Sequence, residues 1–350
     1  MKIALITDIH IGARNDSLIW DDYAQKFWND VFFPYIDKHN IKTVFDLGDT
    51  FDRRKYINYN ILSRSTNYLF KPMMDRNLDV HIIAGNHDVS YKNTNEVNSP
   101  DLLLKKFGFN CYHEATEKEF DGLKVAFLPW ICSDNYQESM AFIHNTNSLF
   151  LFAHLDIAGF EMNKGGSVST HGFDKNIFAK FDTVVSGHFH TKSKQGNIFY
   201  LGTPYEMTWA DYNDPKGFHI FDTETKKFEY IRNPNTLFKK IYYSDVNKNL
   251  EDLLKVEDIQ GSYVKVIVKD KSNPYWFDMY LDALEKMNPA QLQIVEGSIF
   301  VDEDEEIIEG CEDTLTLLRK YCSQIETQVD KKKLDVFVSN LYSEALEVSD

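Results

Sequence analysis

The chain has 350 residues, of which 43% are hydrophobic and 26% are charged. This length is typical of about two domains, and the composition excludes a wholly disordered protein. The formal net charge of −16 argues against a simple polybasic nucleic-acid binder, because such proteins bind mainly by neutralising phosphates. The acidity is uneven: residues 251–350 carry a net charge of −13, whereas residues 1–250 carry −3.

Neither a signal peptide nor a membrane-spanning segment is expected. The N-terminal segment becomes charged at Asp8, and no apolar run approaches the roughly 18 residues that a spanning helix needs. The four cysteines form no CxxC pair, so a cysteine zinc site is not expected. These features predict a protein of a reducing cytoplasm.

Short apolar runs alternate with helical or loop segments over the first 235 residues. The runs are rich in β-branched and aromatic residues and predict strands at residues 2–7, 43–47, 80–84, 124–128, 148–153, 183–186, 198–201, 217–221 and 228–231. Apolar residues recur every four positions between residues 17 and 40, which predicts a helix there with Ser17 as its cap, and residues 58–77 are similar. This order favours an α/β layered sandwich over residues 1–235.

A second unit is expected over residues 236–300. Strands are predicted at 238–243, 263–268 and 291–295, and helices at 247–256 and 276–287, which together describe a small α+β domain. Five consecutive acids at 302–306 predict a solvated linker over residues 301–314. Residues 315–350 show two amphipathic patterns, which predict a helix pair that either packs on the protein or docks on a partner.

Polar side chains follow five of the predicted strands. In chain order they are Asp8 and His10, then Asp49, then Asn86 with His87 and Asp88, then His154, and last His188 and His190. The carboxyl ends of strands in an α/β sheet open into a common crevice, so these side chains are expected to lie together. Alone, the Asp8–His10 pair or His154 is more often structural than functional, and the groups at residues 85–88 and 187–190 favour neither interpretation. All five groups in this order indicate a ligand site.

Carboxylate, imidazole and amide groups together suit manganese, iron or zinc. Seven candidate ligands exceed what one metal ion needs: Asp8, His10, Asp49, Asn86, His154, His188 and His190. Two metal ions that share a bridging carboxylate would use all seven. Gly48, Gly85 and Gly187 precede three of the groups and allow the backbone to turn sharply there.

The motifs DxH at residues 8–10, GDxxDR at 48–53, GNHD at 85–88, a lone His154 and GHxH at 187–190 resemble those of the calcineurin-like metallophosphoesterases. The resemblance covers residues 1–235. It implies one metal ion held by Asp8, His10, Asp49 and His190, and a second held by Asp49, Asn86, His154 and His188. It further implies that His87 is catalytic and that Asp88 orients its imidazole. Water activated by the two metal ions would attack phosphorus, while His87 either protonates the leaving oxygen or hydrogen-bonds the phosphoryl oxygens.

The order of the predicted parts also resembles the SbcD-type recombination nucleases, most closely their phage members. This resemblance implies a manganese-dependent double-strand exonuclease and endonuclease that takes part in DNA recombination, repair and replication. It implies a homodimer acting on double-stranded DNA ends, with residues 58–77 and 99–107 as candidate dimer contacts. Residues 236–300 would be a DNA-contacting cap, and residues 315–350 would dock an SMC-like coiled-coil ATPase. A phage-encoded chain would act in the host cytoplasm.

Basic residues near the expected centre are candidate DNA contacts. Arg53, Arg54 and Lys55 follow the second motif directly, and Lys164 lies in a glycine-containing loop after His154. All four can equally be ordinary surface residues. The chain departs from the cellular nucleases at Asp52, where those relatives carry a histidine, so any role of that histidine in handling substrate is in doubt here.

Two other functions fit the same motifs. A phosphatase acting on phosphoproteins or free nucleotides would use this fold, because a fold does not determine a substrate. A non-catalytic scaffold that binds DNA ends would keep the fold without the chemistry, although the intact set of candidate ligands argues against it. Faster turnover of a phosphopeptide than of DNA would favour the phosphatase, and a protein without metal would favour the scaffold.

Overall fold

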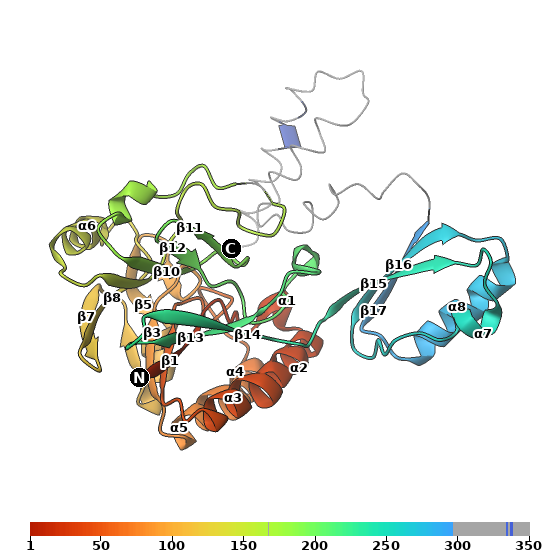
Figure 1. Ribbon diagram of the computed structural model, residues 1–350, viewed down its shortest axis with the longest axis horizontal. Coiled ribbons are helices and arrows are strands. Elements are labelled where there is room, and N and C mark those ends of the chain that lie inside the picture. The colour runs from red at the N-terminus through yellow and green to blue at the C-terminus, as the bar shows by residue number, and fades with distance from the viewer. Residues whose placement is uncertain (167, 297–333, 335–336, 339–350) are drawn as a thin grey trace.

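The computed structural model describes residues 1–166, 168–296, 334, 337 and 338, and two six-stranded sheets form its body (Figure 1). The expected acidic linker lies outside the described residues, and so does the expected C-terminal helix pair apart from residues 334, 337 and 338. The first sheet has the order β14 (Lys227–Arg232), β13 (Gly217–Asp222), β1 (Lys2–Ile6), β2 (Thr43–Asp46), β3 (Asp79–Ile83) and β6 (Asn110–Tyr112). The second has the order β11 (Ser193–Gln195), β12 (Ile198–Tyr200), β10 (Thr183–Gly187), β9 (Phe150–His154), β8 (Leu123–Leu128) and β7 (Thr116–Phe120).

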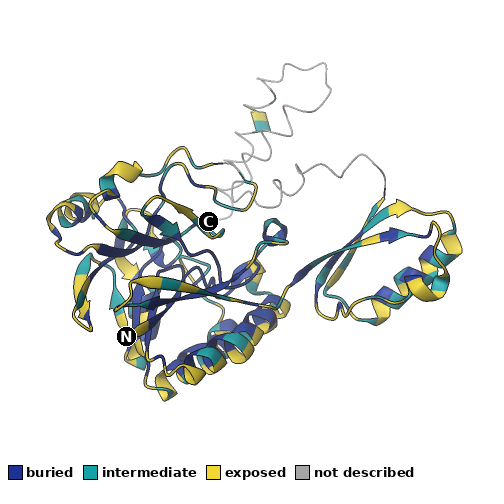
Figure 2. Ribbon diagram, viewed as in Figure 1, coloured by how far each residue is buried: buried dark blue, intermediate teal, exposed yellow. Residues whose placement is uncertain are grey.

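The two sheets pack face to face because their strands are apolar on both faces. The ring of Phe45 on β2 lies 4.8 Å from that of Phe127 on β8 and 5.1 Å from that of Phe152 on β9. All three side chains are fully buried, and Figure 2 shows the strands as the buried interior of the body. Apolar contact of this kind is the main stabilising contribution to such a sandwich. The predicted layered α/β sandwich is confirmed.

Two long helices cover the outer face of the first sheet (Figure 1). One runs through α2 (Leu18–Phe27), the π-helical turn η1 (Trp28–Phe32) and α3 (Phe33–Lys38), and the other through α4 (Tyr59–Ser65), the π-helical turn η2 (Thr66–Phe70) and α5 (Lys71–Asp75). Pro34 and Pro72 lie two residues after the wider turns end, and neither proline has the N–H that would continue the α-helical ladder. Ser17 accepts a hydrogen bond from Trp20 N–H, as expected for the cap.

Shorter elements complete the body. The helices α6 (Tyr136–Asn145) and η5 (Lys175–Phe178) cover the outer face of the second sheet. The sequence pattern did not predict the hairpin of β4 (Val89–Tyr91) and β5 (Thr94–Asn98), the strands β6, β7 and β11, the helix α6, or the short turns α1 (Ala13–Asp16), η3 (Pro100–Leu104), η4 (Lys105–Phe107) and η6 (Trp209–Asp211). The nine strands that it did predict in the body are all present, with ends within two residues of those expected.

Residues 238–296 form a smaller lobe beside the body, at the right of Figure 1. Three parallel strands, β15 (Phe238–Ser244), β16 (Tyr263–Asp270) and β17 (Gln291–Glu296), carry the helices α7 (Leu250–Leu253) and α8 (Pro274–Lys286). The lobe has its own core, in which Tyr243 packs against Phe277 and Tyr280. We refer to this lobe as the cap. Across the described parts of the chain, no helix has the length and apolar character needed to cross a membrane.

Candidate metal centre

The seven candidate ligands stand at or just beyond the ends of β1, β2, β3, β9 and β10. The turns that carry them hold one another, since Asp8 N–H donates to Gly48 O and His10 N–H donates to Asp49 O, each at 2.9 Å. Four of the candidate ligand residues adopt the left-handed backbone region, which residues other than glycine rarely adopt. Their φ angles are 51° at Asp8, 49° at His10, 54° at Asp49 and 91° at His188. Strained backbone of this kind is typical of functional sites.

Glycines allow the turns to approach one another closely. A Cβ atom on Gly85 would lie 2.2 Å from Oδ1 of Asp49, and one on Gly187 would lie 2.0 Å from Oγ1 of Thr7. No side chain fits at these distances. The glycines of the sequence motifs are therefore required because of close packing around the ligands.

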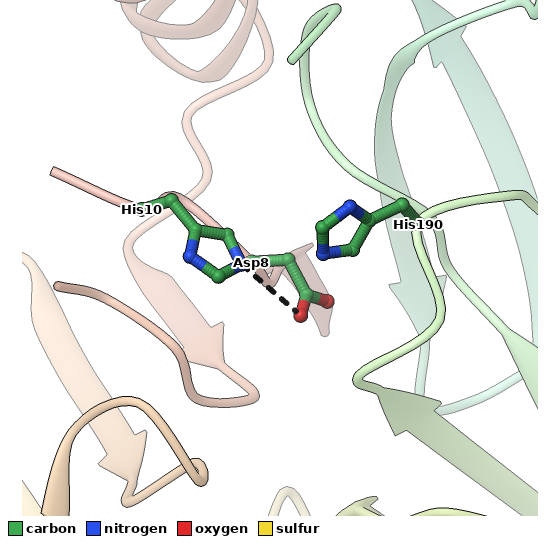
Figure 3. A group of neighbouring side chains, drawn as sticks. All are labelled: Asp8, His10 and His190. Atoms are coloured by element: carbon green, nitrogen blue, oxygen red, sulfur yellow. Dashed lines mark ion pairs between the residues drawn. The ribbon is translucent and has the colours of Figure 1, made fainter. Parts of the chain in front are cut away.

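Asp8, His10 and His190 form the first group of candidate ligands. One ligand atom from each lies within 4.8 Å of the others, and Figure 3 shows the three side chains pointing toward one another. Nε2 of His10 lies 3.9 Å from Oδ1 of Asp8 and 3.9 Å from Oδ2 of Asp49. The motif resemblance placed Asp8, His10 and His190 on one metal ion, and they are together here.

Asp49, His154 and His188 form the second group. Nε2 of His154 lies 3.3 Å from Oδ2 of Asp49 and 3.0 Å from Oδ1 of Asn86. Nδ1 of His154 lies 2.7 Å from the carbonyl oxygen of Leu47, which can only accept, so Nδ1 carries the hydrogen and Nε2 is directed into the centre. Since Asp49 also approaches His10, it lies between the two groups, where a bridging carboxylate is expected.

The donor set fits a pair of divalent cations. Nε2 of His10 is buried and has no hydrogen-bond partner among the residues that the structure describes. Burial lowers the pKa of His188 to about 3 and holds that of His190 well below its usual range, so both imidazoles are neutral, the form that binds metals. Burial also opposes the charge of His10, but Asp52, Asp49 and Asp8 raise its pKa to about 10. The three carboxylates around His10 therefore favour a positive charge at this part of the centre.

His87 lies beside both groups without belonging to the predicted ligand sets. Its backbone N–H donates to Oδ1 of Asp49 at 2.7 Å, and its ring centroid lies 4.9 Å from that of His10. Nδ1 lies 2.6 Å from the carbonyl oxygen of Asp52 and must carry the hydrogen there. Nε2 is consequently the ring nitrogen left for another partner.

Asp88 does not orient His87, contrary to the expectation. Its buried carboxylate accepts hydrogen bonds from the backbone N–H groups of Thr50, Phe51 and Gly85, at 3.3, 3.1 and 3.0 Å, and from the hydroxyl of Ser99 at 3.1 Å. Asp88 therefore connects its own loop, residues 85–88, to the loop at residues 48–53. The imidazole of His87 is held by the Asp52 carbonyl instead. Asp52 also reaches the first group, because its Oδ1 lies 3.3 Å from Nδ1 of His10.

Arg53, Lys55 and Lys164, three of the candidate DNA contacts, interact with other groups of the protein. Nη1 of Arg53 pairs with Asp16 at 2.7 Å, and Lys164 Nζ donates to the carbonyl of Asn213 at 2.8 Å. Arg54 is half-buried and Lys55 is exposed. Arg53 and Lys164 therefore have structural roles in addition to any contact with a substrate.

Sequence reasoning missed two neighbours of the ligands. The ring centroid of Trp130 lies 5.2 Å from that of His188. Nζ of Lys216 is buried and donates to the carbonyl of His190 at 2.8 Å, beside Asp211 and Asp214. Burial opposes the charge of Lys216, but the two carboxylates raise its pKa above the ordinary value. No spacing pattern connects either residue to the ligands, because both contacts depend on the tertiary fold.

Comparison with known proteins agrees with this geometry. The family model described as calcineurin-like phosphoesterase matches residues 1–216. "Exonuclease subunit 1" of Enterobacteria phage T4 is 30% identical over 355 aligned residues, which cover 99% of this chain and all of that protein. The SbcD subunit of the SbcCD nuclease from Staphylococcus saprophyticus is 23% identical, and the match covers 80% of this chain and 78% of that protein.

Among solved structures, an archaeal phosphodiesterase matches with 16% identity and a TM-score of 0.32, over 67% of this chain and 100% of its own. The family assignment depends on the match to the calcineurin-like phosphoesterase model, which spans more than half of the chain and includes all seven candidate ligands. The resemblance drawn from the motifs is confirmed, and the chain belongs to the calcineurin-like phosphoesterase family.

Proposed function

We propose that the chain is a metal-dependent nuclease that hydrolyses the phosphodiesters of double-stranded DNA, as an exonuclease and as an endonuclease. The observation that carries the proposal is the pair of ligand groups with Asp49 between them, since Asp49 belongs to the second group and lies 3.9 Å from Nε2 of His10 in the first. His87 lies beside both and comes within 4.8 Å of ligand atoms of His10 and Asp49. Similarity to phage T4 exonuclease subunit 1 over the full length supports a nucleic-acid substrate rather than a phosphoprotein.

The residues of the centre divide the chemistry between them. Two divalent cations, for which manganese is proposed, would supply Lewis-acid activation of water and offset charge on the phosphoryl oxygens. Asp8, His10, Asp49 and His190 would hold one cation, and Asp49, Asn86, His154 and His188 the other. The Asp52 carbonyl holds the His87 ring through Nδ1–H and leaves Nε2 facing the substrate. In its imidazolium form the ring would donate from Nε2 to an oxygen of the phosphoester, either the leaving oxygen or a phosphoryl oxygen.

The cap supports contact with DNA. A groove of about 630 Å³ runs along β15 beside residues 212–216 of the body, and six basic and four acidic side chains line it. The basic residues are Lys216, Arg232, Lys239, Lys240, Lys248 and Lys255, and the acidic residues are Glu206, Asp214, Asp252 and Glu257. Basic side chains of this kind neutralise phosphates without reading sequence. We propose that the groove, with Arg53, Arg54, Lys55 and Lys164 near the metal centre, follows the DNA backbone.

Assembly is part of the proposal. Both relatives are named as subunits, which supports a complex with an SMC-like coiled-coil ATPase in DNA recombination, repair and replication. Residues 315–350 are proposed to dock the ATPase, and residues 58–77 with 99–107 to form a homodimer. Exposed side chains on this part of the body, Tyr59 at 86% and Leu102 at 70%, are consistent with a surface that a second copy covers.

The test uses the full chain with manganese chloride and linear, circular and phosphopeptide substrates. Cleavage of linear and circular duplex DNA, lost when a chelator is added, is the expected result. Turnover of the phosphopeptide with intact DNA would show a phosphatase instead. Co-purification with a coiled-coil ATPase, compared with and without residues 311–350, tests the docking segment, and equal recovery of the ATPase in both would exclude it.

A further inference from the structure

The peptide group of His190 is held from several sides. Its N–H donates to the carbonyl of Met162 at 3.0 Å, and its carbonyl accepts from Thr203 N–H at 3.1 Å and from Lys216 Nζ at 2.8 Å. The hydroxyl of Thr203 also donates to this carbonyl, at 3.5 Å, so Lys216 is the charged and the nearer of the two side-chain donors. The position of a candidate metal ligand therefore depends on a lysine that is 26 residues away in sequence.

Lys216 is buried, with a side chain that is 3% exposed. Its ammonium group lies 2.6 Å from Oδ1 of Asp211 and 2.8 Å from Oδ2 of Asp214. Oδ2 of Asp214 also accepts from the hydroxyl of Thr191, the residue after the ligand. The charges of Lys216, Asp211 and Asp214 stabilise one another only while all three are present. Removal of the Lys216 ammonium group would leave the two carboxylates without a cation.

Asp211 extends this network to the cap. Its Oδ2 accepts from the N–H groups of Met207 and Thr208, at 2.8 and 2.9 Å, and so fixes the turn η6 that carries Trp209. The ring of Trp209 lies 4.9 Å from that of Phe238, the first residue of β15, and Lys265 Nζ of β16 lies 4.4 Å from the Trp209 ring centroid.

We propose that Lys216 is a positioning residue that fixes His190 for metal binding and connects it to η6, so that metal binding and cap contact stabilise each other. The inference relies on the metal centre of the proposed function but not on any substrate. A connection of this kind is reciprocal, since a contact that strengthens metal binding must itself be strengthened by the metal.

The test measures Mn²⁺ affinity by calorimetry on the full chain without DNA, in Lys216→Met, Lys216→Arg and a control. Lys180→Met is the matched control, because Lys180 also donates three hydrogen bonds, to the carbonyls of Ile143, His144 and Thr146, in a different part of the body. Removal of a residue that supports a metal ligand typically lowers affinity about 10- to 100-fold, and we expect this for Lys216→Met, with partial recovery in Lys216→Arg. Affinity in Lys180→Met should be unchanged.

Hydrogen exchange provides the second measurement. Mn²⁺ is expected to slow exchange of the amides of residues 238–244 in the wild type but not in Lys216→Met. If Lys216→Met does not fold, Asp214→Asn, which keeps the shape and weakens the hold on the ammonium group, should lower Mn²⁺ affinity several-fold.

Trp209→Ala should lower Mn²⁺ affinity in the wild type and have no further effect in Lys216→Met, since the two changes interrupt one connection. Wild-type affinity in Lys216→Met, or an equal loss in Lys180→Met, would overturn the role of Lys216. Absence of Mn²⁺ binding by the wild type would instead contradict the metal centre itself, and the inference with it.

Discussion

The carbonyl oxygen of Asp52 lies 2.6 Å from Nδ1 of His87, and the Asp52 carboxylate lies 3.3 Å from Nδ1 of His10. One residue thus contacts the proposed catalytic histidine through its backbone and a candidate metal ligand through its side chain. Asp52 therefore supports two imidazole rings of the centre, those of His87 and His10.

Replacement of His87 by alanine should abolish most hydrolysis without unfolding the protein. The side chain is half-buried and makes one ring hydrogen bond, so its loss affects packing little. Loss of a general acid typically lowers the rate constant about 10²- to 10⁴-fold. Single-turnover cleavage of linear duplex DNA measures the change, with the exposed His144→Ala as control. Undiminished cleavage by His87→Ala would contradict the assignment of this residue.

Replacement of Asn86 by alanine should lower the metal content by about one ion per chain. Asn86 supplies the amide oxygen of the second group, 3.0 Å from Nε2 of His154. Asn86→Asp keeps an oxygen ligand and should retain both ions. Elemental analysis after dialysis against manganese distinguishes the two variants. Equal metal content in Asn86→Ala and the wild type would exclude Asn86 as a ligand.

Replacement of Gly85 by alanine should destabilise the protein and weaken metal binding, because the added Cβ would lie 2.2 Å from Oδ1 of Asp49. Overpacking of this kind typically costs about 1–3 kcal/mol of unfolding free energy. Gly166→Ala is the milder comparison, since its Cβ would lie 3.1 Å from the Asn163 carbonyl oxygen, a tight contact that a shift of a few tenths of an ångström relieves. Urea denaturation measures both variants, and equal midpoints would show that the 48–49 turn can move away from residue 85.

The stability of the protein should depend on pH through Glu206. Its Oε2 accepts from the N–H groups of Leu237 and Phe238, where the chain enters the cap. Burial raises the pKa of Glu206 from 4.5 to about 7. The folded state therefore binds this proton more tightly than the unfolded chain, and the unfolding free energy should fall by about 3 kcal/mol as the pH rises from 4.5 to above 7.

Glu206→Gln removes this titration and keeps an oxygen that can accept both hydrogen bonds. We expect this variant to lose less stability than the wild type between pH 5 and pH 8. Urea denaturation at several pH values provides the comparison, with the exposed Glu224→Gln as control. Parallel stability curves for Glu206→Gln and the wild type would show that Glu206 is not the titrating group.

The candidate ligands could be located from the sequence because each lies at the end of a buried strand or within four residues of it. A strand fixes where its carboxyl end lies, so Asp8, Asp49 and His154 are placed by local pattern alone once the sheet forms. The body strands are similarly determined by short apolar runs. The β5 segment Thr94–Asn98 has no such run, and it pairs only because the adjacent β4 turns back on it.

Contacts between distant segments could not be predicted. Asp88 follows His87 in the chain, which suggested that the two interact, but its carboxylate is directed toward N–H groups of the 50–51 turn. Lys216 and Glu206 have no sequence signal, because their partners are the carbonyl of His190 and the N–H groups of residues 237 and 238. Backbone partners have no side-chain identity that a sequence pattern could reveal.

The left-handed backbone at Asp8, His10, Asp49 and His188 has a consequence for protein engineering. Each such residue typically costs about 1–3 kcal/mol relative to a relaxed backbone, and glycine would relieve most of it. Selection for thermal tolerance alone would therefore favour glycine at these four positions and so remove the ligands. A laboratory evolution experiment on this chain must screen for metal retention in every round, because its most stable descendants are expected to be inactive.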